Sequence, residues 1–129
     1  MPLVLDTTVL IDVLRGRPAA DRLDDLLIGR ELLLTTAVNV EEVTRGLRPA
    51  EQDAVDLMLD GLLIVPIRRQ EAERAGRWRR EFAALGITLH QADCLIAAAA
   101  YTAGGRLATG NVKDFPMSEL TVEEWPVGT

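Results

Sequence analysis

The chain has 129 residues and a mass of 14.1 kDa, which is enough for one domain and leaves no room for a second independent core. Its 48% hydrophobic and 26% charged residues are typical of a folded globular protein and exclude a disordered or low-complexity chain. The formal net charge of -6 excludes a protein that coats nucleic acid through bulk positive charge.

Strand-length apolar runs alternate with helical patterns along the chain, and this alternation predicts an α/β fold. We expect strands at 2–5, 32–34, 62–66 and 106–109, and the pattern at 120–125 indicates a fifth. We expect helices at about 9–15, 19–28, 37–47, 49–60, 70–85 and 89–103. Thr36 is the expected N-cap of the third helix, and Thr88 with Gln91 forms a capping-box pattern ahead of the last. Residues 1–129 are predicted to form a single domain.

No segment is expected to enter or cross a membrane. The longest apolar stretch, Leu95 to Ala103, is about half the length of a membrane span. The acid at Asp6 follows the start of the chain too closely for a signal peptide. Cys94 is the only cysteine, so an internal disulfide and a cluster of metal-bound thiolates are excluded. We therefore expect a cytoplasmic protein.

Two aspartates lie where predicted strands end. Asp6 follows the first strand and Asp114 follows the fourth, and ligands of open α/β sheets collect beyond the carboxyl ends of the strands. Each aspartate also has a purely structural interpretation. Asp6 fits a helix N-cap, and Asp114 fits a turn beside Pro116. Taken singly, each leaves both interpretations open.

Two further acids, Asp93 and Glu42, lie on predicted helices. The neighbours of Asp93 three, four and seven residues along the helix are small or apolar, and a carboxylate that faces a core is costly without partners. Because Asp93 falls past the first turn of a helix capped by Thr88, we favour function over helix-dipole stabilisation. Glu42 is either half of a solvated acidic pair or a functional residue, because it lies four residues before Gly46, where a missing side chain lets another segment approach closely.

Taken together, the four acids indicate a site for a hard metal ion. The chain has one histidine, His90, and lacks a P-loop, a nucleophile elbow, a zincin motif and a C-x-x-C pair. Carboxylate oxygens are the ligands that Mg²⁺ and Mn²⁺ prefer, and ions held in this way serve phosphoryl chemistry. His90 itself is expected to have a structural or helix-capping role.

Four short segments, in order and at matching separations, resemble the PIN-domain ribonucleases, and most closely the VapC toxins of type II toxin–antitoxin modules. The segments are VLDTT (4–8), EVTRG (42–46), ADCLIAA (92–98) and TGNVKDF (109–115). The resemblance covers essentially the whole chain. It implies a three-layer α/β/α sandwich around a central, mainly parallel sheet of four to five strands.

The resemblance also implies roles for individual residues. The catalytic and metal-binding acids would be Asp6, Glu42, Asp93 and Asp114. Thr7 or Thr8 would be the hydroxyl beside the first acid, and Asn111 would be the polar residue of the last motif, able to share or replace the role of Asp114. The implied activity is a Mg²⁺- or Mn²⁺-dependent endoribonuclease that hydrolyses RNA phosphodiester bonds, with transfer RNA the first expected substrate.

Relatives of this kind work as homodimers and are silenced by a cognate VapB antitoxin, whose C-terminal segment lies in an apolar groove. We expect the same partners here. The apolar positions offered for that groove, some of which core packing also explains, are Val9, Leu10, Val13, Leu14, Leu23, Leu26 and Leu27.

Six arginines lie between Arg68 and Arg80. Interleaved glutamates predict a salt-bridged, solvated helix face for most of them. The candidates for holding RNA phosphates are Arg77 and Arg80 on this helix and Arg45 and Arg48 near Glu42. Trp78 and Cys94 are expected in the core.

Two alternatives remain at this point. A receiver-like phosphoacceptor domain has a similar length and binds Mg²⁺ through acids, but it needs an aspartate at the exit of the third strand, where this chain has Pro66 and Ile67. A non-enzymatic PIN-like binding subunit has the same fold, although such proteins usually lose one or more of the acids that this chain retains.

Overall fold

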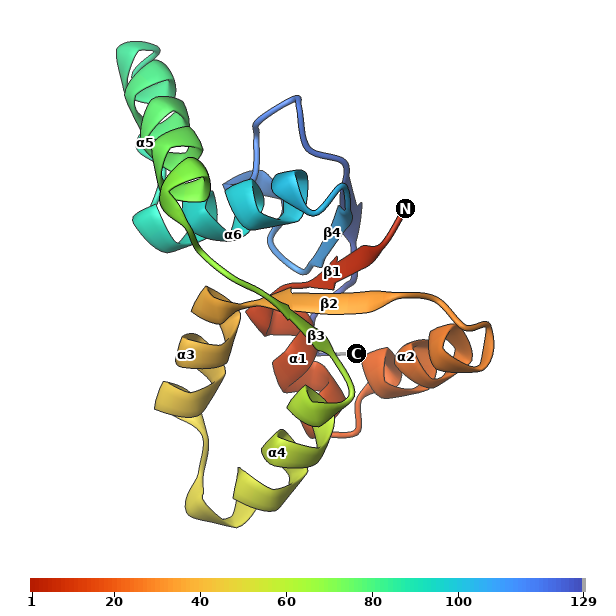
Figure 1. Cartoon of the computed structure of the whole chain (residues 1–129). Coiled ribbons are helices and arrows are strands. Elements are labelled where there is room, and N and C mark those ends of the chain that lie inside the picture. The colour runs from red at the N-terminus through yellow and green to blue at the C-terminus, as the bar shows by residue number, and fades with distance from the viewer. Residues whose placement is uncertain (129) are drawn as a thin grey trace.

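The structure is a computed structural model that describes residues 1–128; Thr129, the last residue of the predicted domain, lies outside the described range. Strands and helices alternate along the chain, as expected (Figure 1). The strands are β1 (Leu3–Leu5), β2 (Leu33–Thr36), β3 (Leu63–Val65), β4 (Arg106–Thr109) and β5 (Val122–Glu124). The helices are α1 (Thr7–Leu14), α2 (Pro18–Ile28), α3 (Ala37–Gly46), α4 (Gln52–Asp60), α5 (Arg69–Ala84) and α6 (Gln91–Thr102), with 3₁₀ turns η1 (Pro49–Glu51) and η2 (Val112–Asp114).

Over residues 1–128 the strands form one five-stranded sheet in the order β3-β2-β1-β4-β5, and every neighbouring pair is parallel. The chain moves outward from β1 through β2 to β3 and then returns to place β4 on the other side of β1. Open parallel sheets bind ligands at such a change of direction, beyond the carboxyl ends of the strands. Asp6 directly follows β1, and the loop that carries Asp114 begins directly after β4. Two of the four candidate acids therefore lie beyond the carboxyl ends of the two strands at this change of direction.

The strand order also decides between two fold classes. Receiver-like domains have the doubly wound order 2-1-3-4-5. The order here differs, with β1 in the middle of the sheet and β3 at an edge. The receiver-like alternative is therefore excluded.

Helices cover both faces of the sheet, which confirms the three-layer α/β/α arrangement (Figure 1). Along β1, Val4 packs into the cluster under α5 and α6, while Leu3 and Leu5 pack into the cluster under α1 to α4. Adjacent side chains of a strand point to opposite faces, so a three-residue run buried on both sides serves both clusters. The sheet thus fixes β1 on both faces and holds Asp6 at its end.

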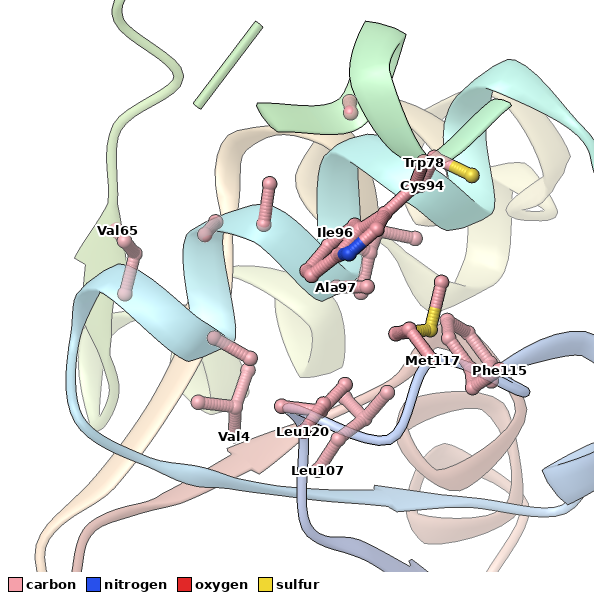
Figure 2. Packing of buried hydrophobic residues seen from close by; sticks show 14 of the residues in the cluster. Val4, Val65, Trp78, Cys94, Ile96, Ala97, Leu107, Phe115, Met117 and Leu120 are labelled. Atoms are coloured by element: carbon pink, nitrogen blue, oxygen red, sulfur yellow. The ribbon is translucent and has the colours of Figure 1, made fainter. Parts of the chain in front are cut away.

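Helix α6 is buried almost all round because it lies between α5 and the sheet. Cys94 and the run Ile96 to Ala100 have no exposed surface, and Trp78 of α5 is 2% exposed. Figure 2 shows Trp78, Cys94, Ile96 and Ala97 within this cluster. The small alanine side chains let α6 approach the strands closely, and they explain why this helix lacks a polar face. The expectation that Trp78 and Cys94 belong to the core is confirmed.

The predicted start of the last helix was wrong. Thr88 does not cap α6; the helix begins at Gln91, His90 occupies the N-cap position, and no side chain caps it. Leu89 is 6% exposed and packs into the core, so the tertiary contact keeps this segment extended past the predicted capping box. Asp93 therefore lies in the first turn of α6.

Two other boundaries also moved. The helix predicted at 49–60 divides into η1 and α4, because Pro49 opens a 3₁₀ turn before the regular helix begins at Gln52. Strand β2 continues past Leu34 to Thr36, since Thr35 and Thr36 pair with β3 and the Thr35 hydroxyl donates to the carbonyl of Leu5 at 2.7 Å. The prediction of Thr36 as the cap of α3 is confirmed. Within residues 1–128 no helix is both long enough and apolar enough to cross a membrane.

Candidate active site

Asp6 sits between β1 and α1, and only 6% of it is exposed. It occupies the N-cap position of α1, but its side chain does not cap the helix. Instead its Oδ2 accepts a hydrogen bond from the Thr109 hydroxyl at 2.7 Å, and its Oδ1 accepts one from Asn39 Nδ2 at 3.1 Å. The carboxylate is thus held between the end of β4 and α3, so the helix-capping interpretation accounts for its backbone and not for its side chain.

The environment of Asp6 disfavours its charge. Burial raises the pKa of this carboxyl above its usual value, and the hydrogen bonds from Thr109 and Asn39 counteract that only in part. The negative charge of Glu42 raises the pKa further.

Glu42 and its neighbour Glu41 have different surroundings. Glu41 is exposed and pairs with Arg45 at 3.3 Å, whereas Glu42 is half-buried and its Oε1 accepts a hydrogen bond from the Thr7 hydroxyl at 2.6 Å. The interpretation of the doublet as two solvated acids is therefore wrong for Glu42. The expected close approach at Gly46 is also wrong, because a Cβ there would meet open space at the surface end of α3.

Asp93 shows that the four acids share one electrostatic field. The pKa of this half-buried carboxyl is raised to about 6, first by burial and then by the negative charges of Asp114, Asp6 and Glu42. The charge of His90 lowers the pKa of Asp93 and so opposes these effects. Its place in the first turn of α6 allows a helix-dipole role as well. The fold nevertheless brings together acids from four separate stretches of the chain.

The last motif places Asp114 and Asn111 differently. Asp114 is half-buried in η2, and its charge is the largest electrostatic contribution to the raised pKa of Asp93. Asn111 is exposed, and within residues 1–128 its side chain makes no hydrogen bond, while its backbone N–H donates to the Thr109 hydroxyl at 3.0 Å. Asp114, and not Asn111, therefore contributes to the negative field at Asp93.

The two threonines after Asp6 have separate roles. Thr7 bonds to Glu42 and accepts from Asn39 Nδ2 at 3.0 Å, so it is the hydroxyl beside the acids. The Thr8 hydroxyl accepts from the backbone N–H of Gly110 at 2.9 Å and ties α1 to the loop that follows β4. A Cβ added at Gly110 would clash with Val127 Cγ2, so any larger residue here would have to displace the Val127 side chain.

Sequence reasoning missed two residues that contact Asp6. Asn39 and Thr109 are both completely buried, and each donates to a different oxygen of that carboxylate. The position of each residue in the sequence could have indicated its role. Thr109 ends a strand at the same edge of the sheet as Asp6, and Asn39 lies three residues after the cap Thr36 and three before Glu42, on the first turn of α3.

The arginines expected near the acids do not neutralise them. Among residues 1–128, no arginine or lysine forms an ion pair with any of the four acids. The expected solvated pairs occur at Arg68–Glu71 and Arg69–Glu73. Arg77 and Arg80 are exposed on α5 and make no ion pair within the described range, while the side chain of Arg45 is 72% exposed and paired with Glu41.

Arg79, which sequence reasoning did not select, approaches the N-terminal end of α6. Its Nε donates to the Leu89 carbonyl at 3.3 Å, and its charge acts on Cys94, the neighbour of Asp93. Arg48 is exposed, and its backbone N–H donates to Glu51.

The donor set fits a hard divalent cation. All four acids offer oxygen ligands, and burial together with neighbouring negative charge raises the pKa values of Asp6 and Asp93. No group of three or more His, Cys, Asp or Glu side chains in residues 1–128 forms a ready-made metal centre. Glu42 is turned towards Thr7, and Asp6 towards Thr109 and Asn39, so the carboxylates do not form a closed coordination shell.

An apolar groove lies on the α1, α2 and α4 side of the molecule. It has a volume of about 420 Å³. Four of the apolar residues expected there line it, namely Val13, Leu14, Leu23 and Leu27, and α4 adds Leu57, which is 78% exposed. Val9 and Leu10 belong to the core instead, and Leu26 packs against it.

Comparison with known proteins agrees with this description. The PIN domain family model matches residues 3–116. The chain is 33% identical to Ribonuclease VapC19 of Mycobacterium tuberculosis over 116 residues, which cover 88% of this chain and 92% of the relative. It is 37% identical to Ribonuclease VapC10 of the same organism over 123 residues, covering 91% and 88%.

Solved structures share the fold. The crystal structure of VapBC2 from Rickettsia felis, bound to a DNA fragment from its promoter, contains a chain that matches with a TM-score of 0.86 and 22% identity, over 97% of this chain and 99% of that one. A chain of VapBC-1 from nontypeable Haemophilus influenzae matches with a TM-score of 0.81 and 24% identity, over 97% and 98%. The chain therefore belongs to the PIN-domain family and, within it, to the VapC ribonucleases.

Proposed function

We propose that this protein is a Mg²⁺- or Mn²⁺-dependent endoribonuclease whose catalytic and metal-binding residues are Asp6, Glu42, Asp93 and Asp114. One observation carries the proposal. Burial, and after it the negative charges of the three other acids, raise the pKa of Asp93 to about 6, and within residues 1–128 no arginine or lysine pairs with any of the four. Such a concentration of uncompensated charge suits a divalent cation, and the relatives at 33% and 37% identity are named ribonucleases.

The proposed chemistry divides between the ion and the chain. A bound divalent ion would polarise the phosphodiester and lower the pKa of an attacking water. The chain holds the ligands: Thr109 and Asn39 orient Asp6, and Thr7 orients Glu42. Asp93 lies in the first turn of α6, and Asp114 lies in η2. Neutralising these carboxylates also allows the anionic RNA backbone to approach them.

Arg77 and Arg80 are our first candidates for contacts to RNA phosphates. Both are exposed on α5 and free of ion pairs within the described residues, so binding a phosphate requires no existing pair to break. Arg45 is a secondary candidate, because it is already paired with Glu41. We place Arg48 with it as a further secondary candidate. Thr8 and Asn111 act in support, by fixing the loop that carries Asp114.

We propose that a VapB-like antitoxin binds in the apolar groove. The similar structures are described as VapBC complexes, and the exposed leucines Leu27 and Leu57 at the groove would gain from coverage by an apolar segment. We further propose that the whole chain acts as one PIN domain, in the cytoplasm and as a homodimer. Co-expression with a VapB-like antitoxin should yield a complex that a Leu57→Glu substitution weakens.

The test of the ribonuclease proposal uses purified protein stripped of metal and incubated with total RNA, with and without Mg²⁺ or Mn²⁺, followed by mapping of the cleaved ends. Asp93→Asn is compared with Asp53→Asn, since both aspartates lie in the first turn of a helix. Discrete, metal-dependent cuts that disappear only with Asp93→Asn support the proposal. A folded protein that binds metal and antitoxin but cuts none of the RNA fractions, transfer RNA included, contradicts it and favours the non-enzymatic binding subunit.

A further inference from the structure

We propose that Asn39 is a positioning residue that sets the orientation of two of the proposed metal ligands, Asp6 and Glu42, through a single side-chain amide. The inference rests on the proposed function of the acids and adds a residue to it.

The first support is the complete use of the amide. Asn39 is fully buried, and its Oδ1 accepts from the Thr36 backbone N–H at 3.2 Å and from the Thr36 hydroxyl at 2.8 Å. Its Nδ2 donates to Asp6 Oδ1 at 3.1 Å and to the Thr7 hydroxyl at 3.0 Å. Two donors face the oxygen and two acceptors face the nitrogen, so the amide has one favourable orientation.

The second support is the direction that this amide imposes on Thr7. A threonine hydroxyl has one hydrogen, and a donor at its oxygen leaves that hydrogen free to point elsewhere. Because Asn39 Nδ2 donates to the Thr7 oxygen, the hydrogen of Thr7 is available to Glu42 Oε1, 2.6 Å away. A continuous series of bonds therefore runs from Asn39 through Thr7 to Glu42, and a second branch runs from Asn39 to Asp6.

A helix-capping role does not account for this arrangement. The capping box of α3 uses the Asn39 oxygen and backbone N–H together with Thr36. The two bonds from Nδ2 contribute nothing to the cap and both lead to the acids. Residues that orient metal ligands from behind typically change metal affinity by about 10–100-fold when they are removed.

Asn39→Leu tests the proposal, because leucine has the same branching at Cγ and lacks the amide. Thr35→Val is the matched control: Thr35 is equally buried, and its hydroxyl donates to the Leu5 carbonyl without touching the acids. Calorimetric titration with Mn²⁺ and thermal melting are measured for both variants. We expect both to lower the melting temperature, and only Asn39→Leu to weaken Mn²⁺ binding, by about tenfold or more. Equal Mn²⁺ affinities in folded Asn39→Leu and the control would overturn the proposal.

Thr7 provides a second test that does not depend on the folding of Asn39→Leu, because Thr7 is half-buried. Thr7→Val should weaken Mn²⁺ binding and Thr7→Ser should restore it. Unchanged binding in Thr7→Val would contradict the branch to Glu42. Asp93→Asn distinguishes failure of the proposed function from failure of the Asn39 role, because Asp93 lies outside this hydrogen-bond series. If Asp93→Asn leaves Mn²⁺ binding intact, the proposed function fails; if only Asp93→Asn weakens it, the role of Asn39 alone fails.

Discussion

Two buried aspartates, Asp6 at the start of α1 and Asp12 within the same helix, have different partners for their carboxylates. Asp12, in α1, is 3% exposed, pairs with Arg17 at 2.7 Å and accepts from the Gly128 backbone N–H at 2.9 Å. Asp6, at the start of the same helix, is 6% exposed, and its side-chain partners are the neutral groups of Thr109 and Asn39. A buried charge is costly unless it is paired. The protein supplies a cation to the structural acid and leaves the one near Glu42 and Asp93 without one.

The largest expected effect follows from this difference. Asp93→Asn should reduce RNA cleavage by about 10³-fold, because metal-assisted stabilisation contributes several kcal/mol to the transition state. The same variant should fold normally, since it removes a repelled charge. Asp53→Asn should retain full activity. Cleavage rates under single-turnover conditions and circular dichroism of both variants provide the measurement.

At Asp12 we expect a substitution to change the stability of the protein and not its response to metal. Arg17→Ala should lower the free energy of unfolding by about 1–3 kcal/mol, because it leaves a buried carboxylate with one backbone donor. Its response to Mg²⁺ should match that of the unmodified protein. Arg45→Ala, which breaks an exposed pair with Glu41, should cost less than about 1 kcal/mol. Urea unfolding with and without Mg²⁺ checks both values, and an Arg17→Ala protein that loses metal binding would contradict the separation of the two acids.

The pH dependence of stability sharpens the comparison. The folded pKa of Asp93, about 6, lies above its ordinary value of 3.8, so the folded state holds a proton more tightly between these values. Its contribution to stability is fully present below pH 3.8 and is lost as the pH rises through about 6. Without metal, we compare the free energy of unfolding of the unmodified protein with that of Asp93→Asn. When the pH rises from 4 to 7, we expect this difference to shift by about 1–2 kcal/mol against the unmodified protein. Saturating Mg²⁺ should remove that difference at pH 7. A difference between the two proteins that does not change with pH would show that Asp93 is not perturbed.

The smallest effect concerns the C-terminal segment, which connects the two regions. Gly128 bonds to Asp12, and Val127 occupies the space beside Gly110 in the loop that leads to Asp114. Gly110→Ala should cost about 1 kcal/mol, because the added Cβ displaces Val127. Gly46→Ala, with open space around it at the end of α3, should be neutral or stabilise by about 0.5 kcal/mol. Thermal melting compares the two, and equal effects would mean that Val127 does not pack against this loop.

Much of the site could be predicted from the sequence, because it depends on local order along the chain. Apolar runs predicted the strands, and Asp6 and Asp114 follow two of them. Thr36 carried a recognisable cap signal, and α3 begins directly after it. The assignment of Asp93 to a position past the first turn failed, because the burial of Leu89 overrides a local capping pattern. Long-range packing of one side chain outweighs the modest free energy of a helix cap.

The sequence by itself determined the alternation of strands and helices, and it singled out the four acids as candidates because no other recognised catalytic motif is present. These features reside in residue type and spacing. Only the tertiary structure decided that Glu42 and Glu41 have different surroundings, that Thr7 rather than Thr8 faces the acids, and that Asn39 and Thr109 hold Asp6. Apart from the local Glu41–Arg45 pair, those contacts join residues that lie 33 to 103 positions apart in the chain, and hydrogen-bond partners at such separations depend on how the layers pack.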